Sequence, residues 1–125
     1  SMEVEVLYKE LSFEIVGVLF DVYNELGPNH PEKFYQKAVA KGLKTKSIKF
    51  IEQVYIKLEY QEERVGFYYL DFQIEDKIVL ELKVKPRFQT CDYDQVKKYL
   101  IANNLKLGIL ATFTHDGVKF KRVLI

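Results

Sequence analysis

Two acids and a lysine in two neighbouring β-patterned runs are spaced so that strand pairing would bring them together, with the acids placed to bind a metal ion. Asp71 lies in the first run, and Glu81 and Lys83 lie in the second, which gives the pattern D-x9-E-x-K. Side chains alternate faces along a strand, so Glu81 and Lys83 share a face. If the turn is centred on Asp76, Asp71 lies opposite Glu81, with Cβ atoms about 4.5–5.5 Å apart. A turn of another length would change this register.

Two facing carboxylates destabilise a sheet unless a positive charge lies between them. Hard oxygen ligands of this kind suit Mg²⁺ or Mn²⁺, and a bound metal would lower the pKa of a coordinated water. Lys83 could orient that water or stabilise charge in the transition state. The three residues therefore contain the minimum set for hydrolysis of a phosphodiester.

The same three residues also fit a structural role. In a chain with 30% charged residues, such a pattern arises readily by chance. Glu81 and Lys83 would then belong to a solvated strand face with a cross-strand Lys–Asp pair. The apolar run from Ile78 to Leu80 weighs against this alternative, because it is typical of a strand buried on both faces. A buried acid needs a partner or a metal.

Composition indicates one globular domain over residues 1–125. The net charge of +1 does not identify a nucleic-acid-binding protein. Basic residues are nevertheless clustered in two regions: Lys41, Lys44, Lys46 and Lys49, and Lys83, Lys85, Arg87, Lys97 and Lys98.

A cytoplasmic protein is expected from three observations. The single cysteine, Cys91, excludes an internal disulfide and fits a reducing compartment. No apolar run of about 18 residues and no signal-peptide pattern is present, so no membrane is expected as a partner.

Ser1 before Met2 is interpreted as a residue left by expression and is set aside.

Periodicity predicts the order α-α-β-β-β-α-β-β, an α/β layered domain in which an antiparallel meander precedes a crossover helix. Helices are expected over residues 8–26, 31–43 and 92–103, and strands over 47–61, 65–74, 77–84, 105–113 and 118–124. Leu70, Phe72 and Ile74 should share the apolar face of the second strand. The first turn between strands is expected at residues 62–64, and Asp92 as the cap of the last helix.

The chain resembles the small GxxExxY proteins, a branch of the PD-(D/E)XK nuclease superfamily. The resemblance covers nearly the whole length and rests on a set of short motifs: Leu26, Gly27 and Pro28 followed by Glu32 and Tyr35, Asp71 with Glu81, Leu82 and Lys83, and Gln95 with Tyr99. It implies a restriction-endonuclease-like three-layer core, with a mixed central sheet flanked by helices. The signature glycine falls at Asn29, and asparagine tolerates left-handed geometry better than most residues.

The resemblance also implies roles for five residues. Glu32, Asp71 and Glu81 would be the ligands of Mg²⁺ or Mn²⁺, Lys83 would be the catalytic lysine, and Gln95 would accompany the active site. Two structural alternatives stay open. Glu32 fits an acid at a helix start, and Gln95 fits a capping box with Asp92.

Other aromatic and histidine side chains are expected to have structural roles. Tyr35 and Tyr99 are interpreted as core-edge aromatics, and Phe67 to Tyr69 as a packed cluster. His30 lies either at the edge of the site or in a solvated loop, and two histidines are too few for a zinc site.

Two functions remain as hypotheses. The first is a Mg²⁺-dependent nuclease that hydrolyses DNA, or alternatively RNA, with phosphates contacted by the basic residues near Lys83 and Lys97. The second is a non-catalytic accessory module that binds nucleic acid or protein and retains the nuclease fold. A homodimer would supply more surface to grip a duplex, although the sequence shows no interface.

Overall fold

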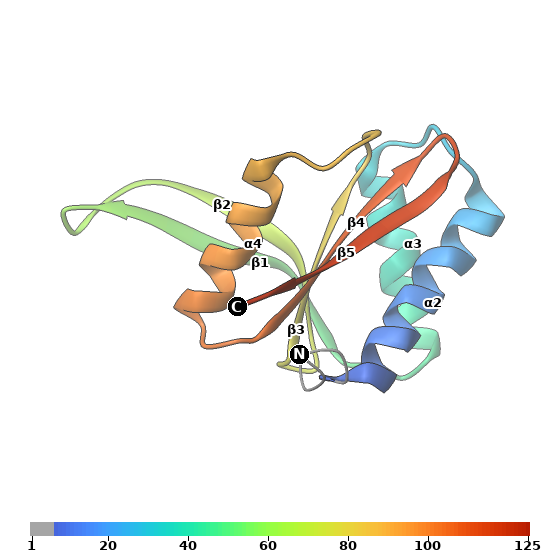
Figure 1. Cartoon of the computed structure of the whole chain (residues 1–125), viewed down its shortest axis with the longest axis horizontal. Coiled ribbons are helices and arrows are strands. Elements are labelled where there is room, and N and C mark those ends of the chain that lie inside the picture. Colours follow the sequence, from blue (N-terminus) through green and yellow to red (C-terminus); the bar gives the residue numbers. More distant parts are fainter. Residues whose placement is uncertain (1–6) are drawn as a thin grey trace.

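The structure is a computed structural model that describes residues 7–125, so the interpretation of Ser1 and Met2 lies outside it. The elements follow the predicted order (Figure 1). They are α2 (Lys9–Leu26), α3 (Glu32–Thr45), β1 (Phe50–Tyr60), β2 (Glu63–Ile74), β3 (Ile78–Lys83), α4 (Thr90–Ala102), β4 (Leu107–Thr114) and β5 (Gly117–Leu124). No helix within residues 7–125 is long and apolar enough to cross a membrane.

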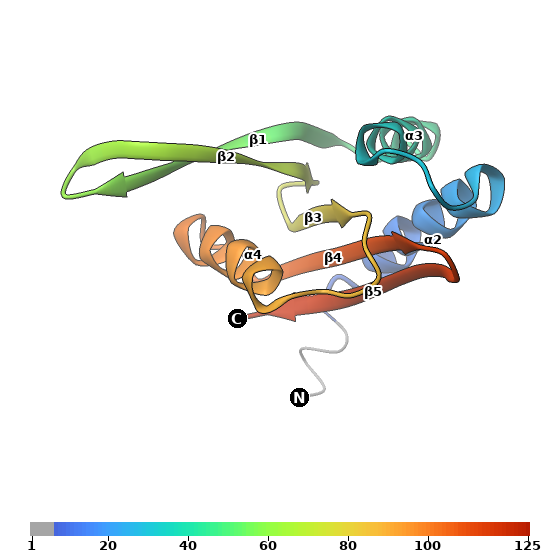
Figure 2. The ribbon, with the colours of Figure 1, turned by 90° about the horizontal axis from the view of Figure 1, so that it is seen from above.

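The five strands form one mixed sheet in the order β1-β2-β3-β4-β5. Neighbouring strands are antiparallel except β3 and β4, which are parallel and are joined through α4. Helices α2 and α3 lie on one side of the sheet and α4 on the other (Figures 1 and 2). The predicted three-layer α/β architecture is therefore confirmed.

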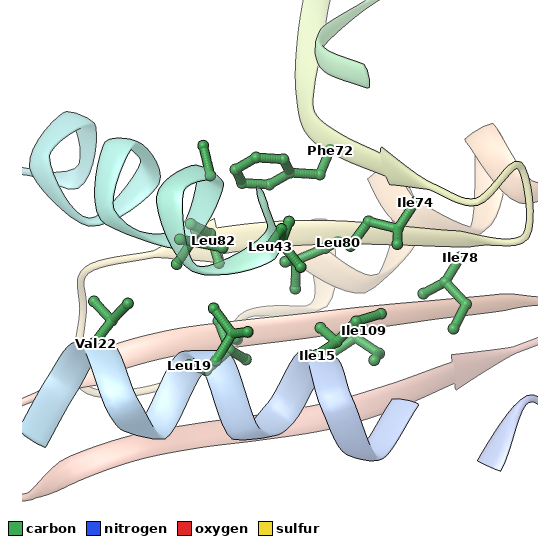
Figure 3. Packing of buried hydrophobic residues seen from close by; sticks show 14 of the residues in the cluster. Ile15, Leu19, Val22, Leu43, Phe72, Ile74, Ile78, Leu80, Leu82 and Ile109 are labelled. Atoms are coloured by element: carbon green, nitrogen blue, oxygen red, sulfur yellow. The ribbon is translucent and has the colours of Figure 1, made fainter. Parts of the chain in front are cut away.

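The larger core lies between the sheet and the helices α2 and α3. Its helix side comes from residues spaced three or four apart, such as Ile15, Leu19 and Val22 on α2, as Figure 3 shows. Alternate residues of β3, including Leu80 and Leu82, supply the sheet side. The two helices approach closely at Gly42, where an added Cβ would lie 2.6 Å from Cγ1 of Val18.

A smaller core lies between the sheet and α4. Val79 and Leu110 face it from the sheet, and Val96 and Leu100 face it from the helix. At Gly108 an added Cβ would lie 2.5 Å from Cγ1 of Val96, so a glycine lets α4 approach β4. Strand β3 is consequently covered on both faces, as the apolar run before Glu81 indicated.

Strand β2 changes face between Leu70 and Phe72. Phe72 packs in the core under α2 and α3, whereas Leu70 packs in the core under α4. The prediction that Leu70 shares a face with Phe72 was therefore wrong. The physical reason lies in the neighbouring strand, where Gln53 falls opposite Asp71 in the register and has a left-handed φ of 52°. This residue breaks the regular alternation of both strands.

Beyond this break the outer part of the β1–β2 hairpin extends past the body of the molecule (Figures 1 and 2). We call its mostly exposed residues, 57–67, the hairpin arm. Its tip is a two-residue turn at Gln61 and Glu62, both with positive φ, so β2 begins at Glu63 and the predicted turn over residues 62–64 was wrong. Phe67 and Tyr69 pack against each other, as expected, but about half of each side chain is exposed.

Candidate active site

Asp71 and Glu81 meet where β2 separates from β3. The pairs Ile74–Ile78 and Phe72–Leu80 centre the hairpin on Asp76, which makes Asp71 and Glu81 the next pair in the register. At this point the carboxylates of the two acids, in place of backbone carbonyls, accept the hydrogen bonds between the strands. The Asp71 N–H donates to Glu81 Oε1 at 3.0 Å, and the Leu82 N–H donates to Asp71 Oδ2 at 2.7 Å. The predicted juxtaposition is therefore present in the structure.

The two carboxyl groups perturb each other because both are buried, with 7% of Asp71 and 4% of Glu81 exposed. Burial, followed by the negative charge of Glu81, raises the pKa of Asp71 to about 8. Burial also raises the pKa of Glu81, although its hydrogen bonds with Asp71 and the charge of Lys83 oppose the rise. The side chains hydrogen-bond to each other, so the pair retains a proton near neutral pH.

Lys83, the last residue of β3, and Lys85, two residues further on, approach acidic side chains of the site. Lys83 Nζ lies 3.5 Å from Glu81 Oε2 and 3.8 Å from Asp92 Oδ1. Lys85 Nζ lies 2.5 Å from Asp92 Oδ2. The backbone of Lys85 is held by Thr112 of β4, whose hydroxyl accepts from the Lys85 N–H at 3.0 Å and donates to the Lys85 carbonyl at 2.6 Å. Strand β4 thereby positions the chain directly after Lys83.

Asp92 is held by the start of α4. The helix is capped by Gln89, and Asp92 is the third helical residue of a capping box, accepting from the Gln89 N–H at 2.7 Å. The prediction of Asp92 as the cap was wrong, and so was the alternative that pairs it with Gln95. Burial alone would raise the pKa of Asp92, but hydrogen bonds from Lys85 and Gln89 lower it.

Glu32 lies at the first residue of α3, on the side of the acid pair. Burial raises its pKa, the charge of Asp71 raises it further, and the charge of Lys83 lowers it. Its side chain nevertheless remains exposed. Gln95 is half-buried on α4, and its side chain makes no hydrogen bond with any residue of the described range 7–125. The structure therefore brings Asp71, Glu81 and Lys83 together and leaves Glu32 and Gln95 without direct bonds to them.

The donor set fits a divalent cation held by two protein carboxylates. Within residues 7–125, no three His, Cys, Asp or Glu side chains are grouped so that they could hold a metal. Asp71 and Glu81 each keep one carboxylate oxygen that accepts no bond from a backbone amide. Mg²⁺ usually retains several waters and binds through one or two carboxylates, so this pair matches its requirement.

Asp92 and Tyr68 were not expected near the acids, and Lys85 was expected to contact phosphates but not to pair with an acid. Asp92 and Lys85 pair with each other beside Lys83. The pKa of Tyr68 is raised by burial and by the charge of Glu81, so its hydroxyl also lies near the acids. Lys85 continues the two-residue spacing of Glu81 and Lys83, a signal consistent with its position beside them. For Asp92 the sequence indicated only a position at the start of a helix.

Aromatic and histidine side chains near the site have structural roles. Tyr35 is fully buried, stacks on Phe113 at 4.1 Å between ring centroids, and donates from its hydroxyl to the Gly27 carbonyl at 2.5 Å. The Tyr99 hydroxyl bonds to the Gln73 side chain. Tyr99 therefore confirms the expectation of a core-edge aromatic, whereas Tyr35 lies inside the larger core with only its hydroxyl reaching the loop after α2. His30 lies half-buried in the loop between α2 and α3, as the loop alternative expected, and its Nε2 lies 2.8 Å from the Leu26 carbonyl at the end of α2.

Residues 9–123 match a family model described as the PD-(D/E)XK nuclease superfamily. The chain belongs to this superfamily. Among solved structures, the crystal structure of SSO0001 has a TM-score of 0.55 and 19% identity to the PD-(D/E)XK chain described here. The match covers 98% of this chain and 60% of SSO0001, and at this identity it shows the fold alone. No curated protein matches the chain.

Membership in the PD-(D/E)XK superfamily identifies the fold of this chain. The layered domain is restriction-endonuclease-like, as the resemblance implied. Proteins of this superfamily are generally nucleases, which typically use divalent metals and bind nucleic acid.

Proposed function

We propose that this chain is a single-domain, divalent-metal-dependent phosphodiesterase that cleaves nucleic acid, DNA in preference to RNA. One observation carries the proposal: two buried carboxyl groups touch each other beside Lys83, and each is fixed by a backbone amide of the other strand. A structural role in an ion pair with Lys83 would require only one acid. Two buried carboxylates in contact are costly unless a cation neutralises them.

We also assign the chain to the GxxExxY branch. The loop after α2 supports this assignment, because Asn29 has a left-handed φ of 71° where the signature has glycine. Tyr35 holds the same loop through its hydrogen bond to Gly27. The replacement of glycine by asparagine is thus compatible with the loop shape.

The residues have distinct roles in the proposed reaction. Mg²⁺ or Mn²⁺, when bound, supplies charge neutralisation at the phosphoryl oxygens and lowers the pKa of a water. Asp71 and Glu81 would hold the ion, and Glu32, which makes no direct bond to them in this structure, would have to approach the bound ion from α3. Lys83 would orient the attacking water or stabilise the developing charge. Gln95 would line the site from α4.

Metal binding to the wild type and to Asp71→Asn, measured by calorimetry with Mg²⁺ or Mn²⁺, tests the proposal. We expect one binding event with release of a proton from the acid pair, because the ligands must be deprotonated. The event should disappear in Asp71→Asn and persist in Asp76→Asn, a matched change in the exposed turn. Absence of binding to the folded wild type would contradict the metal site.

Cleavage assays on DNA and RNA separate the metal ligands from the assisting lysine. Lys83→Ala should abolish cleavage while retaining the metal-binding event, because Lys83 contributes no ligand. Circular dichroism should show that both variants remain folded. Cleavage that is unchanged in Asp71→Asn would disprove the assigned roles.

The alternative is a non-catalytic nucleic-acid- or protein-binding module. The observation in its favour is that Lys83 and Lys85 already pair with Glu81 and Asp92, so charges in the site are partly compensated without a metal. This alternative predicts that nucleic acid binds equally well to the wild type and to Asp71→Asn, with no metal-binding event in either.

A further inference from the structure

Helix α3 carries a stripe of lysines that the proposed reaction does not use. Lys33, Lys37, Lys41 and Lys44 are all exposed and follow a spacing of four, four and three residues, which places them on one face of the helix. They line a shallow depression of about 580 Å³ together with Gln36, Glu52 and Gln53. We call these four residues the α3 lysine stripe.

The charges of the stripe are not neutralised within the described part of the chain. The ion pairs over residues 7–125 involve Lys57, Lys83 and Lys85, and none includes a lysine of the stripe. Glu52 lines the same depression, but its carboxylate accepts from Gln36 at 3.4 Å. Like charges four residues apart destabilise a helix, so an unpaired stripe is suited to an anionic partner that spans several turns.

The position and length of the stripe match the backbone of a nucleic acid. The helix begins at Glu32, beside the acid pair, and Lys33 is its next residue. From Lys33 to Lys44 the helix rises about 16 Å, which corresponds to about five phosphates at 3.4 Å per nucleotide along one strand. All the residues that line the depression except Ala40 carry a polar or charged group, which suits phosphates better than an apolar ligand.

We propose that the α3 lysine stripe binds the phosphate backbone of the substrate strand on one side of the scissile bond, leading away from the acid pair. This inference rests on the proposed nuclease function. Lysine contacts to phosphates position a strand without reading its sequence, so the stripe would contribute affinity and orientation. Glu32 would then mark the end of the stripe nearest to the reacting phosphate.

Fluorescence anisotropy with a labelled DNA duplex of about 20 base pairs tests the inference over ~50–200 mM salt, in EDTA so that no cleavage occurs. The test variant is the triple change Lys37→Gln, Lys41→Gln and Lys44→Gln. Its matched control is Lys106→Gln, Lys119→Gln and Lys121→Gln, three exposed lysines on β5 and just before β4. The stripe variant should bind at least about tenfold more weakly, and its slope of log K against log salt should be shallower by about 2–3.

Three outcomes would overturn the inference: equal losses in the two triple variants, no DNA binding by the wild type, or poly-L-glutamate displacing DNA at equal charge concentration. The last would indicate an acidic protein as the partner. Failure of the proposed function has a different signature. In that case metal binding and cleavage are absent, while DNA binding and its dependence on the stripe persist.

Discussion

At the scale of single residues, the acids of the site are held by backbone amides from a neighbouring segment. Glu81 is held by the N–H of Asp71, Asp71 by the N–H of Leu82, and Asp92 by the N–H of Gln89. An amide that donates to a carboxylate fixes both its place and its orientation. The acids are therefore positioned by the fold before any ligand binds.

Asp92 should stabilise the protein chiefly through its pairing with Lys85. In Asp92→Asn the amide oxygen can still accept from Gln89, but the ion pairs with Lys85 and Lys83 are lost. We expect the free energy of unfolding to fall by about 1–2 kcal/mol, less than for a fully buried pair because Lys85 is partly exposed. Urea denaturation measures the change. Asp94→Asn, an exposed acid of the same helix, should change stability by less than about 0.5 kcal/mol, and equal effects would contradict this role.

Residue spacing was sufficient to predict the contact between Asp71 and Glu81. The two residues are symmetric about Asp76, and strand alternation fixes the rest. Lys85 and Asp92 could not be paired in the same way, because their contact depends on the path of the loop between β3 and α4. No periodicity determines such a path.

At the scale of elements, glycines set how closely helices pack. Gly42 lies where α3 meets Val18 of α2, and Gly108 lies where β4 meets α4. Gly17 of α2, by contrast, has no atom within 4 Å of the position of an added Cβ. Two helical glycines of the same chain thus have different packing environments.

Replacing these two helical glycines by alanine should change stability in opposite directions. Gly17→Ala should raise the free energy of unfolding by about 0.5–1 kcal/mol, because alanine has the higher helix propensity. Gly42→Ala should lower the free energy of unfolding by about 1 kcal/mol. The added methyl group would overlap the buried Val18, and the cost of moving Val18 exceeds the gain in helix propensity. Thermal and urea unfolding of both variants provide the measurement. A stabilising Gly42→Ala would show that the helices can separate without cost.

The helices and inner strands were predictable because their apolar residues recur at regular spacing. The turn and the change of face in the β1–β2 hairpin were less predictable from the sequence. The tip of the hairpin has Gln61 and Glu62 at left-handed positions that Gly or Asn usually occupy, so the turn gave no signal. Gln53 likewise adopts positive φ without any local indication, and this is why the change of face at Leu70 was missed.

At the scale of the whole molecule, the buried acids link global stability to pH. The pKa values of Asp71, Glu81 and Glu32 are all raised in the folded chain. Between the ordinary pKa of an aspartate and about 8, the folded state therefore binds more protons than the unfolded state. Under linkage, stability falls as pH rises through this window.

The melting temperature of the metal-free protein should decrease from about pH 5 to pH 8.5, because the pair must lose its proton. Asp71→Asn should flatten this dependence, since it removes the group with the pKa of about 8. Adding Mg²⁺ should restore more stability at the upper end of the range, where the ligands are already deprotonated. Differential scanning calorimetry measures all three effects. A wild-type melting temperature that rises over the same range would contradict the raised pKa of the pair.

The hydrogen bonds between the acids and the opposing strand have a practical consequence for mutagenesis. Where β2 leaves β3, the carboxylates of Asp71 and Glu81 occupy the place of ladder carbonyls. Truncating either one to alanine would leave a buried amide without an acceptor, at a cost of about 1–3 kcal/mol. An alanine scan would thus confuse loss of strand pairing with loss of catalysis. Only isosteric changes such as Asp71→Asn and Glu81→Gln, which keep an acceptor oxygen, can separate the two.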